Sequence, residues 1–256
     1  MEKINLTAYK DPKSPISEAY RTIRTNIQFA GVDKPMQVII VTSATPHEGK
    51  STVIASLAIV LAQAGKKVLL MDCDFRNPTQ HKLFGLENKG TTNYVATGEP
   101  LVNLLQAADQ ANLTVLPSGP VPPNPSEILT SQKYAVLLEK FKKEYDYILL
   151  DTPPVLPVTD ASALSTKADG VLLVVASNEI SPSEAKLAKT RLELAGAKII
   201  GCVLNKVDLA PHGYGYGYGK YGNYGYYYYY GHEGDGKEHH HHHEEATQEE
   251  NTAETK

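Results

Sequence analysis

The stretch VIIVTSATPHEGKST, residues 38–52, decides the fold of this chain. It begins with the apolar run Val38–Thr42, which predicts a short buried strand. The residues from Ser51 to Ala64 then predict a helix that ends at Gly65. A loop that leaves a strand and opens a helix in this way is the setting of a phosphate-binding loop.

The loop is close to the phosphate-binding consensus G-x-x-x-x-G-K-[ST], with Ala44 in place of the first glycine. Backbone N–H groups and the N-terminus of the following helix would hold phosphate oxygens. Lys50 would reach the β- and γ-phosphates of a nucleotide, and Ser51 would bind Mg²⁺. The candidates for nucleotide binding in this loop are Glu48, Gly49, Lys50, Ser51 and Thr52.

Five more apolar runs predict strands, namely Val68–Asp72, Leu113–Leu116, Tyr147–Asp151, Val171–Ala176 and Ile199–Asn205. Helices are expected at Ser17–Phe29, Ser126–Glu144 (in two pieces), Asp160–Thr166 and Pro182–Ala195. Because the strands are nearly continuous apolar runs, they indicate burial on both faces and hence a mostly parallel sheet covered by helices. The expected fold class is α/β with a doubly wound sheet, in which ligands bind beyond the carboxyl ends of the strands.

Two further loops at strand ends carry carboxylates. The loop after the second strand contains Asp72 and Asp74, a pair that suits a divalent cation or a proton-acceptor role. A capped turn would explain the same residues, since Asp and Asn-Pro favour turns. The fourth strand ends in Asp151, the position of the second metal-binding element of phosphate-loop ATPases. These loops are therefore expected to converge with the Lys50 loop on one site.

Composition limits the class of protein. The chain has 256 residues and a net charge of −4, and residues 232–256 alone hold eight acidic residues and two lysines. Neither this segment nor the rest has the basic balance of a nucleic-acid binder, so no nucleic acid is expected as a partner. Two distant cysteines, Cys73 and Cys202, indicate a reducing compartment. Without an apolar run of membrane-spanning length or a signal peptide, the chain is expected to be cytoplasmic.

Four segments differ in composition. Residues 1–15 predict an extended arm, with Ser14 or Ser17 as the cap of the helix that follows. Residues 16–209, including the helix 17–29, predict one globular domain, whereas residues 210–231 and 232–256 predict a disordered tail that is first tyrosine-rich and then acidic and histidine-rich. His239–His243 form a run of five histidines. A purification tag and a natural low-complexity tract explain this run equally well, and no metal is assigned to it.

The tyrosine-rich tail holds ten of the sixteen tyrosines, at Tyr214, Tyr216, Tyr218, Tyr221, Tyr224, Tyr226, Tyr227, Tyr228, Tyr229 and Tyr230. Glycines alternate with the first of them, and no aliphatic side chains are present to pack against. Such a segment predicts hydroxyl groups presented on a flexible backbone, as a substrate for modification would be. It raises the hypothesis that the globular domain modifies tyrosine.

Three motifs together resemble the bacterial tyrosine kinases of capsule and exopolysaccharide synthesis: PHEGKST (46–52), VLLMDCDFRNP (68–78) and YILLDTPP (147–154). The second is the most specific, because the family has an apolar strand followed by D-x-D-x-R, matched here by Asp72, Asp74 and Arg76. The helix with Glu18, Arg21 and Arg24 is similar to the family's E-x-x-R-x-x-R oligomerisation helix, and PNPSEIL (123–129) is also typical. The resemblance covers residues 14–208 and the tyrosine-rich tail, and it implies a P-loop NTPase fold of the partition-ATPase-like, deviant Walker group.

The resemblance implies a cytoplasmic, ATP-dependent protein-tyrosine kinase that phosphorylates the tyrosines of its own tail, together with other tyrosine-containing proteins. Its cofactors would be ATP and Mg²⁺, with Lys50 and Ser51 on the phosphates and the metal and Asp151 in the magnesium shell. Asp72 and Asp74 would position the metal and draw the proton from the incoming tyrosine hydroxyl. Because that hydroxyl has a pKa of about 10, it needs an acceptor at neutral pH. Which aspartate is the acceptor stays open.

The same resemblance implies a ring homo-oligomer in which Glu18, Arg21 and Arg24 contact the neighbouring subunit. A separate transmembrane activator would recruit the kinase to the inner face of the cell membrane. A simpler interpretation of the three charged residues is a solvated helix face with local ion pairs.

Two other functions compete with the kinase. Asn205-Lys206-Val207-Asp208 matches the N-K-x-D guanine motif of GTPases, but Asp151 is followed by TPP rather than by D-x-x-G. We therefore interpret Asn205 as an adenine contact. A non-kinase ATPase switch of the partition type would share the loops, although it has no use for ten terminal tyrosines. His47, where the family often has glycine, is expected to be a solvated bystander.

Overall fold

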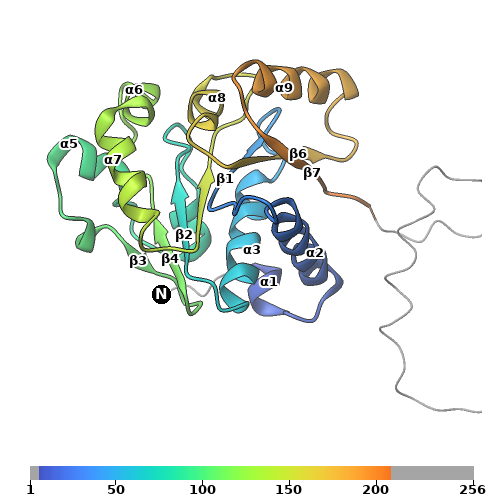
Figure 1. Cartoon of the computed structure of the whole chain (residues 1–256), viewed down its shortest axis with the longest axis horizontal. Helices are drawn as coiled ribbons and strands as arrows, with labels where there is room; N and C mark the ends of the chain where they lie inside the picture. Colours follow the sequence, from blue (N-terminus) through green and yellow to red (C-terminus); the bar gives the residue numbers. More distant parts are fainter. Residues whose placement is uncertain (1–5, 209–256) are drawn as a thin grey trace, which may run out of the picture. The chain divides into compact units, whose positions relative to one another are not determined.

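The computed structural model describes residues 6–208, so residues 1–5 and both tail segments lie outside the described part of the chain. A seven-stranded sheet with the order β3-β4-β2-β5-β1-β6-β7 forms its centre (Figure 1). The strands are β1 Val38–Ser43, β2 Val68–Asp72, β3 Gln106–Ala107, β4 Leu113–Leu116, β5 Tyr147–Asp151, β6 Gly170–Ala176 and β7 Ile199–Asn205. Neighbouring strands are parallel except β3 and β4. The predicted mostly parallel sheet is confirmed, and each predicted strand lies within one residue of its observed bounds.

Helices cover both faces of this sheet. They are α1 Thr7–Lys10, α2 Pro15–Ala30, α3 Lys50–Gln63, α4 Gln80–Phe84, α5 Thr91–Thr97, α6 Pro125–Thr130, α7 Gln132–Phe141, α8 Asp160–Ser165 and α9 Pro182–Leu194, with the 3-10 helix η1 Leu101–Asn103. Alternate residues of β1 face two different cores: Ile39 and Val41 lie with α3, whereas Val38 and Ile40 lie with α7 and α8. Burial on both faces explains the continuous apolar runs of the inner strands, whereas the edge strand β7 is only partly buried.

The N-terminal segment differs from the sequence-based expectation of an extended arm. Its described part contains α1, in which Ala8 is fully buried and beside which Leu6 is nearly so. Nε2 of Gln63 at the end of α3 donates to the carbonyl oxygen of Ala8 at 3.2 Å. Two apolar side chains docked on α3 therefore outweigh the polar composition of the segment. As expected, Ser14 caps α2, because its hydroxyl accepts from the N–H of Ser17 at 3.2 Å.

The segment between β2 and β4 contains elements that were not predicted, namely α4, α5, η1 and the two-residue edge strand β3. Each is too short to show a clear periodicity in sequence. Further along, the predicted break in the helix over 126–144 is confirmed at Ser131, which ends α6 and caps α7.

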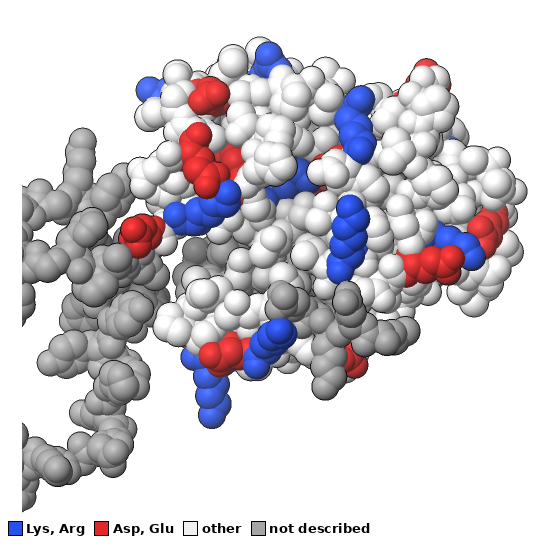
Figure 2. Space-filling model, turned by 180° about the vertical axis from the view of Figure 1, so that it is seen from behind, with Lys and Arg blue, Asp and Glu red and all other residues white. Residues whose placement is uncertain are grey.

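Two surface properties follow from the described residues. No helix among residues 6–208 is long and apolar enough to cross a bilayer. On the face shown in Figure 2, the described lysines and arginines lie singly or beside acidic residues rather than in a continuous basic patch.

Candidate functional site

The loop between β1 and α3 has a shape that its own residues impose. Gly49, the N-cap of α3, has φ +88°, and His47 has φ +68°, which is the left-handed region that favours glycine. His47 is exposed to solvent. The carboxylate of Glu48 is buried and accepts from the N–H of Thr45 at 2.6 Å and from the N–H of Ala176 at 2.9 Å. Glu48 thus fastens the loop to the end of β6, and its carboxylate is used by the protein's own backbone.

Asn205 at the end of β7 supports the same loop. Its Nδ2 donates to the carbonyl oxygen of Glu48 at 2.8 Å. A Cβ placed on Gly49 would lie only 2.2 Å from this Nδ2, so the close approach requires glycine. The neighbouring Lys206 forms an ion pair with Glu179 at 2.7 Å. The adenine contact expected of Asn205 stays a prediction, beside a contact within the loop that the sequence did not reveal.

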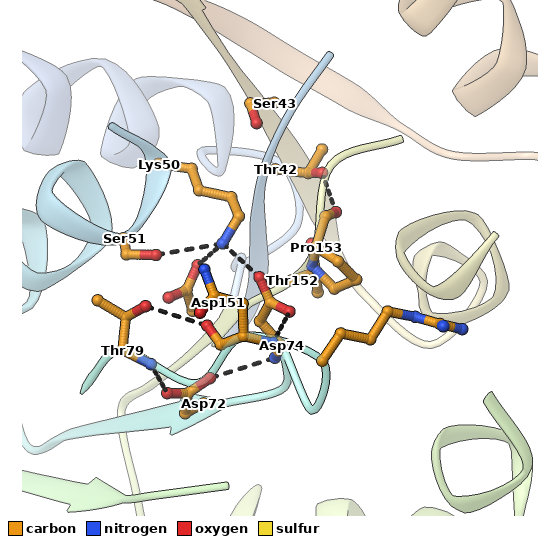
Figure 3. A network of polar contacts seen from close by, with 12 residues as sticks. Thr42, Ser43, Lys50, Ser51, Asp72, Asp74, Thr79, Asp151, Thr152 and Pro153 are labelled. Atoms are coloured by element: carbon orange, nitrogen blue, oxygen red, sulfur yellow. Dashed lines mark hydrogen bonds and ion pairs between the residues drawn. The ribbon is translucent and has the colours of Figure 1, made fainter. Parts of the chain in front are cut away.

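Lys50, the first residue of α3, reaches across the ends of the strands (Figure 3). Its Nζ lies 2.9 Å from Oδ2 of Asp74, 3.3 Å from Oδ1 of Asp151 and 3.1 Å from Oγ of Ser51. Burial disfavours the charged ammonium, but Asp151 and Asp74 outweigh it, so the pKa of Lys50 is raised. The three predicted loops do meet at one place, and they meet at this ammonium group.

Asp72 organises the loop that follows β2. Its Oδ2 accepts from the N–H groups of Thr79 at 2.8 Å and of Gln80 at 2.9 Å, and its Oδ1 accepts from the N–H of Asp74 at 3.2 Å. The side chain is fully buried. Burial, together with the charge of Asp151, raises the pKa of Asp72 to about 7 despite the two backbone hydrogen bonds to Oδ2. The metal contact expected of Asp72 stays a prediction, beside three backbone hydrogen bonds to its carboxylate that the sequence did not reveal.

Asp151 is the register partner of Asp72 across β2 and β5 and is also fully buried. Its Oδ1 faces Lys50, and its Oδ2 accepts from Nε2 of Gln80 at 2.7 Å. The same Nε2 donates to the carbonyl oxygen of Ser51 at 3.1 Å. Gln80, which the sequence did not single out, therefore connects β5, the phosphate loop and the loop after β2.

Arg76, the arginine of D-x-D-x-R, points to a different partner. Its Nε lies 2.9 Å from Oδ2 of Asp160, the first residue of α8, whose carboxylate is fully buried. Ser126 in α6 donates to Oδ1 of Asp160 at 2.6 Å. The buried carboxylate of Asp160 thus connects the D-x-D-x-R loop after β2 with the PNPSEIL segment and with α8. The pairing of Arg76 with Asp160 had no signal in the sequence.

The charged residues of α2 have local partners. Arg21 forms an ion pair with Glu18 and donates to the carbonyl oxygen of Pro12 at 2.5 Å. Nη1 of Arg24 donates to the carbonyl oxygen of Val60 in α3 at 3.1 Å. These contacts lie within one chain, and the expected contact to a neighbouring subunit stays a prediction.

The oxygens around Lys50 fit a magnesium ion of the kind that accompanies nucleotide phosphates. Mg²⁺ prefers oxygen ligands, keeps several waters and is usually held by one or two carboxylates plus phosphates. Ser51, Asp74 and Asp151 already place their oxygens around the positive charge of the Lys50 ammonium. Among residues 6–208 no three His, Cys, Asp or Glu side chains form a metal cage by themselves. The oxygens of Ser51, Asp74 and Asp151 therefore suit a cation that arrives with phosphates.

Comparison with known proteins agrees with this arrangement. The AAA domain family matches residues 36–190. The tyrosine-protein kinase YwqD of Bacillus subtilis (strain 168) is 46% identical over 222 residues, which are 86% of this chain and 91% of that protein. The kinase domain of the Escherichia coli tyrosine kinase ETK has a TM-score of 0.79 at 36% identity, over 85% of this chain and 86% of that one. The chimerical protein CapA2B2 has a TM-score of 0.77 at 43% identity, over 79% and 89%.

A mostly parallel sheet, a lysine-bearing phosphate loop and aspartates at the ends of two adjacent strands define a P-loop NTPase fold. Within that class, the chain belongs to the bacterial tyrosine kinases, the family that its motifs resemble.

Proposed function

We propose that the chain is an ATP-dependent kinase that transfers phosphate to the tyrosines of its own tail. The observation that carries this proposal is the junction of Lys50, Asp72, Asp74 and Asp151 at the N-terminus of α3, in a chain with ten tyrosines in one terminal segment. A helix N-terminus with backbone N–H groups favours phosphate, and Lys50 supplies a positive charge beside it. An ATPase switch without kinase activity would need the junction of Lys50 with the aspartates, but it would not need the tyrosine-rich tail.

ATP and Mg²⁺ are the proposed cofactors. When bound, Mg²⁺ would neutralise the negative charge that develops on the phosphates during transfer. Ser51 and Asp151 would hold it, with Asp74 beside them, while Lys50 exchanges its carboxylate partners for phosphate oxygens. In the N-K-x-D alternative for GTP, Lys206 forms an exposed ion pair with Glu179, which does not decide between the two bases. Competition between ATP and GTP in a binding assay separates the two nucleotides.

We propose Asp72 as the group that takes the proton from the tyrosine hydroxyl. A pKa of about 7 suits a proton acceptor at neutral pH. Its Oδ1 accepts a single hydrogen bond, at 3.2 Å, and keeps a lone pair for the hydroxyl, which can reach it only once the loop that buries Asp72 opens. Asp74, in contrast, holds Lys50 with Oδ2 and the N–H of Asn77 with Oδ1. We therefore propose that Asp74 orients Lys50 and the metal and that it does not accept the proton.

The transfer is proposed to occur between subunits of a ring assembled through Glu18, Arg21 and Arg24 of α2. A glycine-rich chain spans only about 5–6 Å times the square root of its residue number, so a neighbour's site is as accessible as its own. Each phosphotyrosine adds about −1.5 to −2 charges. Because the terminal segment 232–256 is already acidic, we expect extensive phosphorylation to loosen the ring.

Regulation of capsular or exopolysaccharide synthesis and export is proposed from family membership. A separate transmembrane activator would recruit the kinase to the inner face of the cell membrane, and other tyrosine-containing proteins would be further substrates. Co-purification of the chain with a membrane protein encoded for the same pathway, lost when that protein is deleted, tests the recruitment.

A mixing experiment tests the proposed transfer. Lys50→Met with an intact tail is combined with a wild-type chain truncated after residue 208, in Mg²⁺-ATP, and phosphotyrosine is followed by blotting. Label on the Lys50→Met chain supports transfer in trans. Label on the full wild-type chain alone, with none in the mixture, would contradict transfer between subunits but not the kinase activity.

A further inference from the structure

Gln80 stands out among the buried polar residues. It is the first residue of α4 and its side chain is fully buried. Its backbone N–H donates to Asp72 at 2.9 Å, and its Nε2 donates to Asp151 at 2.7 Å and to the carbonyl oxygen of Ser51 at 3.1 Å. One residue thus contacts all three elements that form the site.

The orientation of the carboxamide follows from its neighbours. Oδ2 of Asp151 and the carbonyl oxygen of Ser51 are both acceptors, so the group that faces them must be the donating NH₂. The other atom of the same planar group, Oε1, is then fixed beside it. Oε1 is buried and has no hydrogen-bond partner among the described residues. A buried acceptor left without a partner costs free energy, so its retention at this place calls for an explanation.

We propose that Gln80 is a positioning residue for magnesium: its NH₂ group holds Asp151 and the Ser51 backbone in place, and its Oε1 accepts a hydrogen bond from a water molecule of the ion's hydration shell. Mg²⁺ keeps several waters when it binds with phosphates, and each of these waters is a strong donor. Ligating carboxylates are themselves oriented by hydrogen bonds, and such partners tune metal affinity. The inference rests on the proposed function, since it assigns a role toward the proposed cofactor.

The test is ADP binding by calorimetry, once in EDTA and once in excess Mg²⁺, for wild type and Gln80→Met. Methionine has a similar length and lacks both polar atoms. Gln37→Met is the matched control, because Nε2 of Gln37 also donates to two carbonyl oxygens, of Lys142 at 2.6 Å and of Tyr145 at 2.7 Å. Gln37 precedes β1, at the amino ends of the parallel strands, whereas the site lies at their carboxyl ends. Circular dichroism in each buffer reports whether the variants are folded.

We expect Gln80→Met to bind ADP in EDTA within about twofold of wild type, because Glu48 and Asn205 still hold the phosphate loop and the carboxamide contacts only one carbonyl oxygen of it, that of Ser51. The gain in affinity from Mg²⁺ should fall by about 10- to 100-fold, while Gln37→Met keeps the wild-type gain. Should Gln80→Met fail to fold, Gln80→Asn, whose carboxamide stops one carbon short of Asp151, is expected to show the same selective loss.

Two results would overturn the inference. If Mg²⁺ raises the ADP affinity of Gln80→Met as much as that of wild type, Gln80 plays no part in holding the ion. An equal loss of affinity with and without Mg²⁺ would show that Gln80 only shapes the loop. A wild type that gains nothing from Mg²⁺ would instead contradict the proposed cofactor, and the role of Gln80 would fall with it.

Discussion

Nζ of Lys50 lies 2.9 Å from Oδ2 of Asp74, so the lysine of the phosphate loop is bound to the second aspartate of the D-x-D-x-R motif. Both side chains are almost entirely buried, and Asp151 and Asp72 add two more buried carboxylates nearby. Lys50 is therefore the cation that balances three carboxylates as well as the proposed ligand of the phosphates.

Lys50→Met is expected to destabilise the chain in EDTA at pH 8 by about 3 kcal/mol or more, because removing one partner leaves buried charges uncompensated. Asp72, whose pKa is raised to about 7, gains its proton as the pH falls from 8 to 6, which removes one of the uncompensated charges, so the loss should shrink toward pH 6. Urea unfolding at the two pH values measures it. Lys66→Met, at an exposed position, serves as the control and should change little. A loss that grows toward pH 6 would contradict the account.

The raised pKa of Asp72 predicts the pH dependence of stability in EDTA. The folded carboxyl keeps its proton up to about pH 7, whereas the unfolded one loses it near pH 4. Between these values the folded state binds the extra proton, so unfolding free energy should fall as pH rises from 5 to 7 and then level off. Asp72→Asn should flatten the curve over this interval. Equal slopes for the two proteins would show that Asp72 does not titrate there.

Gly49→Ala is expected to cost more than the left-handed backbone alone explains. At Gly65, with φ +80°, a Cβ would meet nothing within 4 Å, so Gly65→Ala should cost only about 1–2 kcal/mol. At Gly49 the Cβ would also collide with Asn205. Thermal unfolding should show the larger loss for Gly49→Ala, with part of it recovered in Gly49→Ala/Asn205→Ala. Equal losses at both glycines would refute the proposed steric conflict.

Arg76→Ala is expected to leave the buried carboxylate of Asp160 with Ser126 as its remaining side-chain partner. The side chain of Arg76 is 42% exposed, which limits the expected loss to about 1–2 kcal/mol. In a double-mutant cycle with Asp160→Asn, the two losses should be strongly non-additive. Lys89→Ala provides the comparison, because its pair with Glu87 is exposed on both sides and should contribute almost nothing.

The proposed ring predicts that changes in α2 alter assembly without altering the site. Glu18→Ala/Arg21→Ala/Arg24→Ala should be monomeric by light scattering and bind ADP like wild type. Arg24 also holds α2 against α3 through the carbonyl oxygen of Val60, so its replacement can weaken the fold. The double variant Glu18→Ala/Arg21→Ala keeps this contact and therefore tests assembly with less effect on folding. A mass unchanged in both variants would mean that α2 is not the interface.

Sequence patterns predicted the inner strands well because they are buried on both faces and are apolar up to their last residue, as in β2 Val68–Asp72. The edge strand β7 was also found from its apolar run, although its residues are only partly buried. Short elements such as β3 and α1 were not predicted, because they depend on tertiary contacts. In α1, for example, Ala8 is buried and contacts α3. In the site, consensus spacing located Lys50, Asp72, Asp74 and Asp151. It did not show that Glu48 and Asn205 bind the loop's own backbone. Nor did it show that Gln80 binds Asp151 or that Asp160 binds Arg76, because a single polar residue at the start of a helix belongs to no spaced motif.

The central claim, ATP-dependent transfer to the chain's own tail, is tested most directly by phosphopeptide mapping. Wild type and Lys50→Met are incubated with Mg²⁺-ATP under conditions in which circular dichroism shows both folded. The account predicts phosphate on several tyrosines between Tyr214 and Tyr230 in wild type, with no single one essential, and none in Lys50→Met. Tail phosphate in both proteins, or none in a wild type that binds ATP, would contradict it.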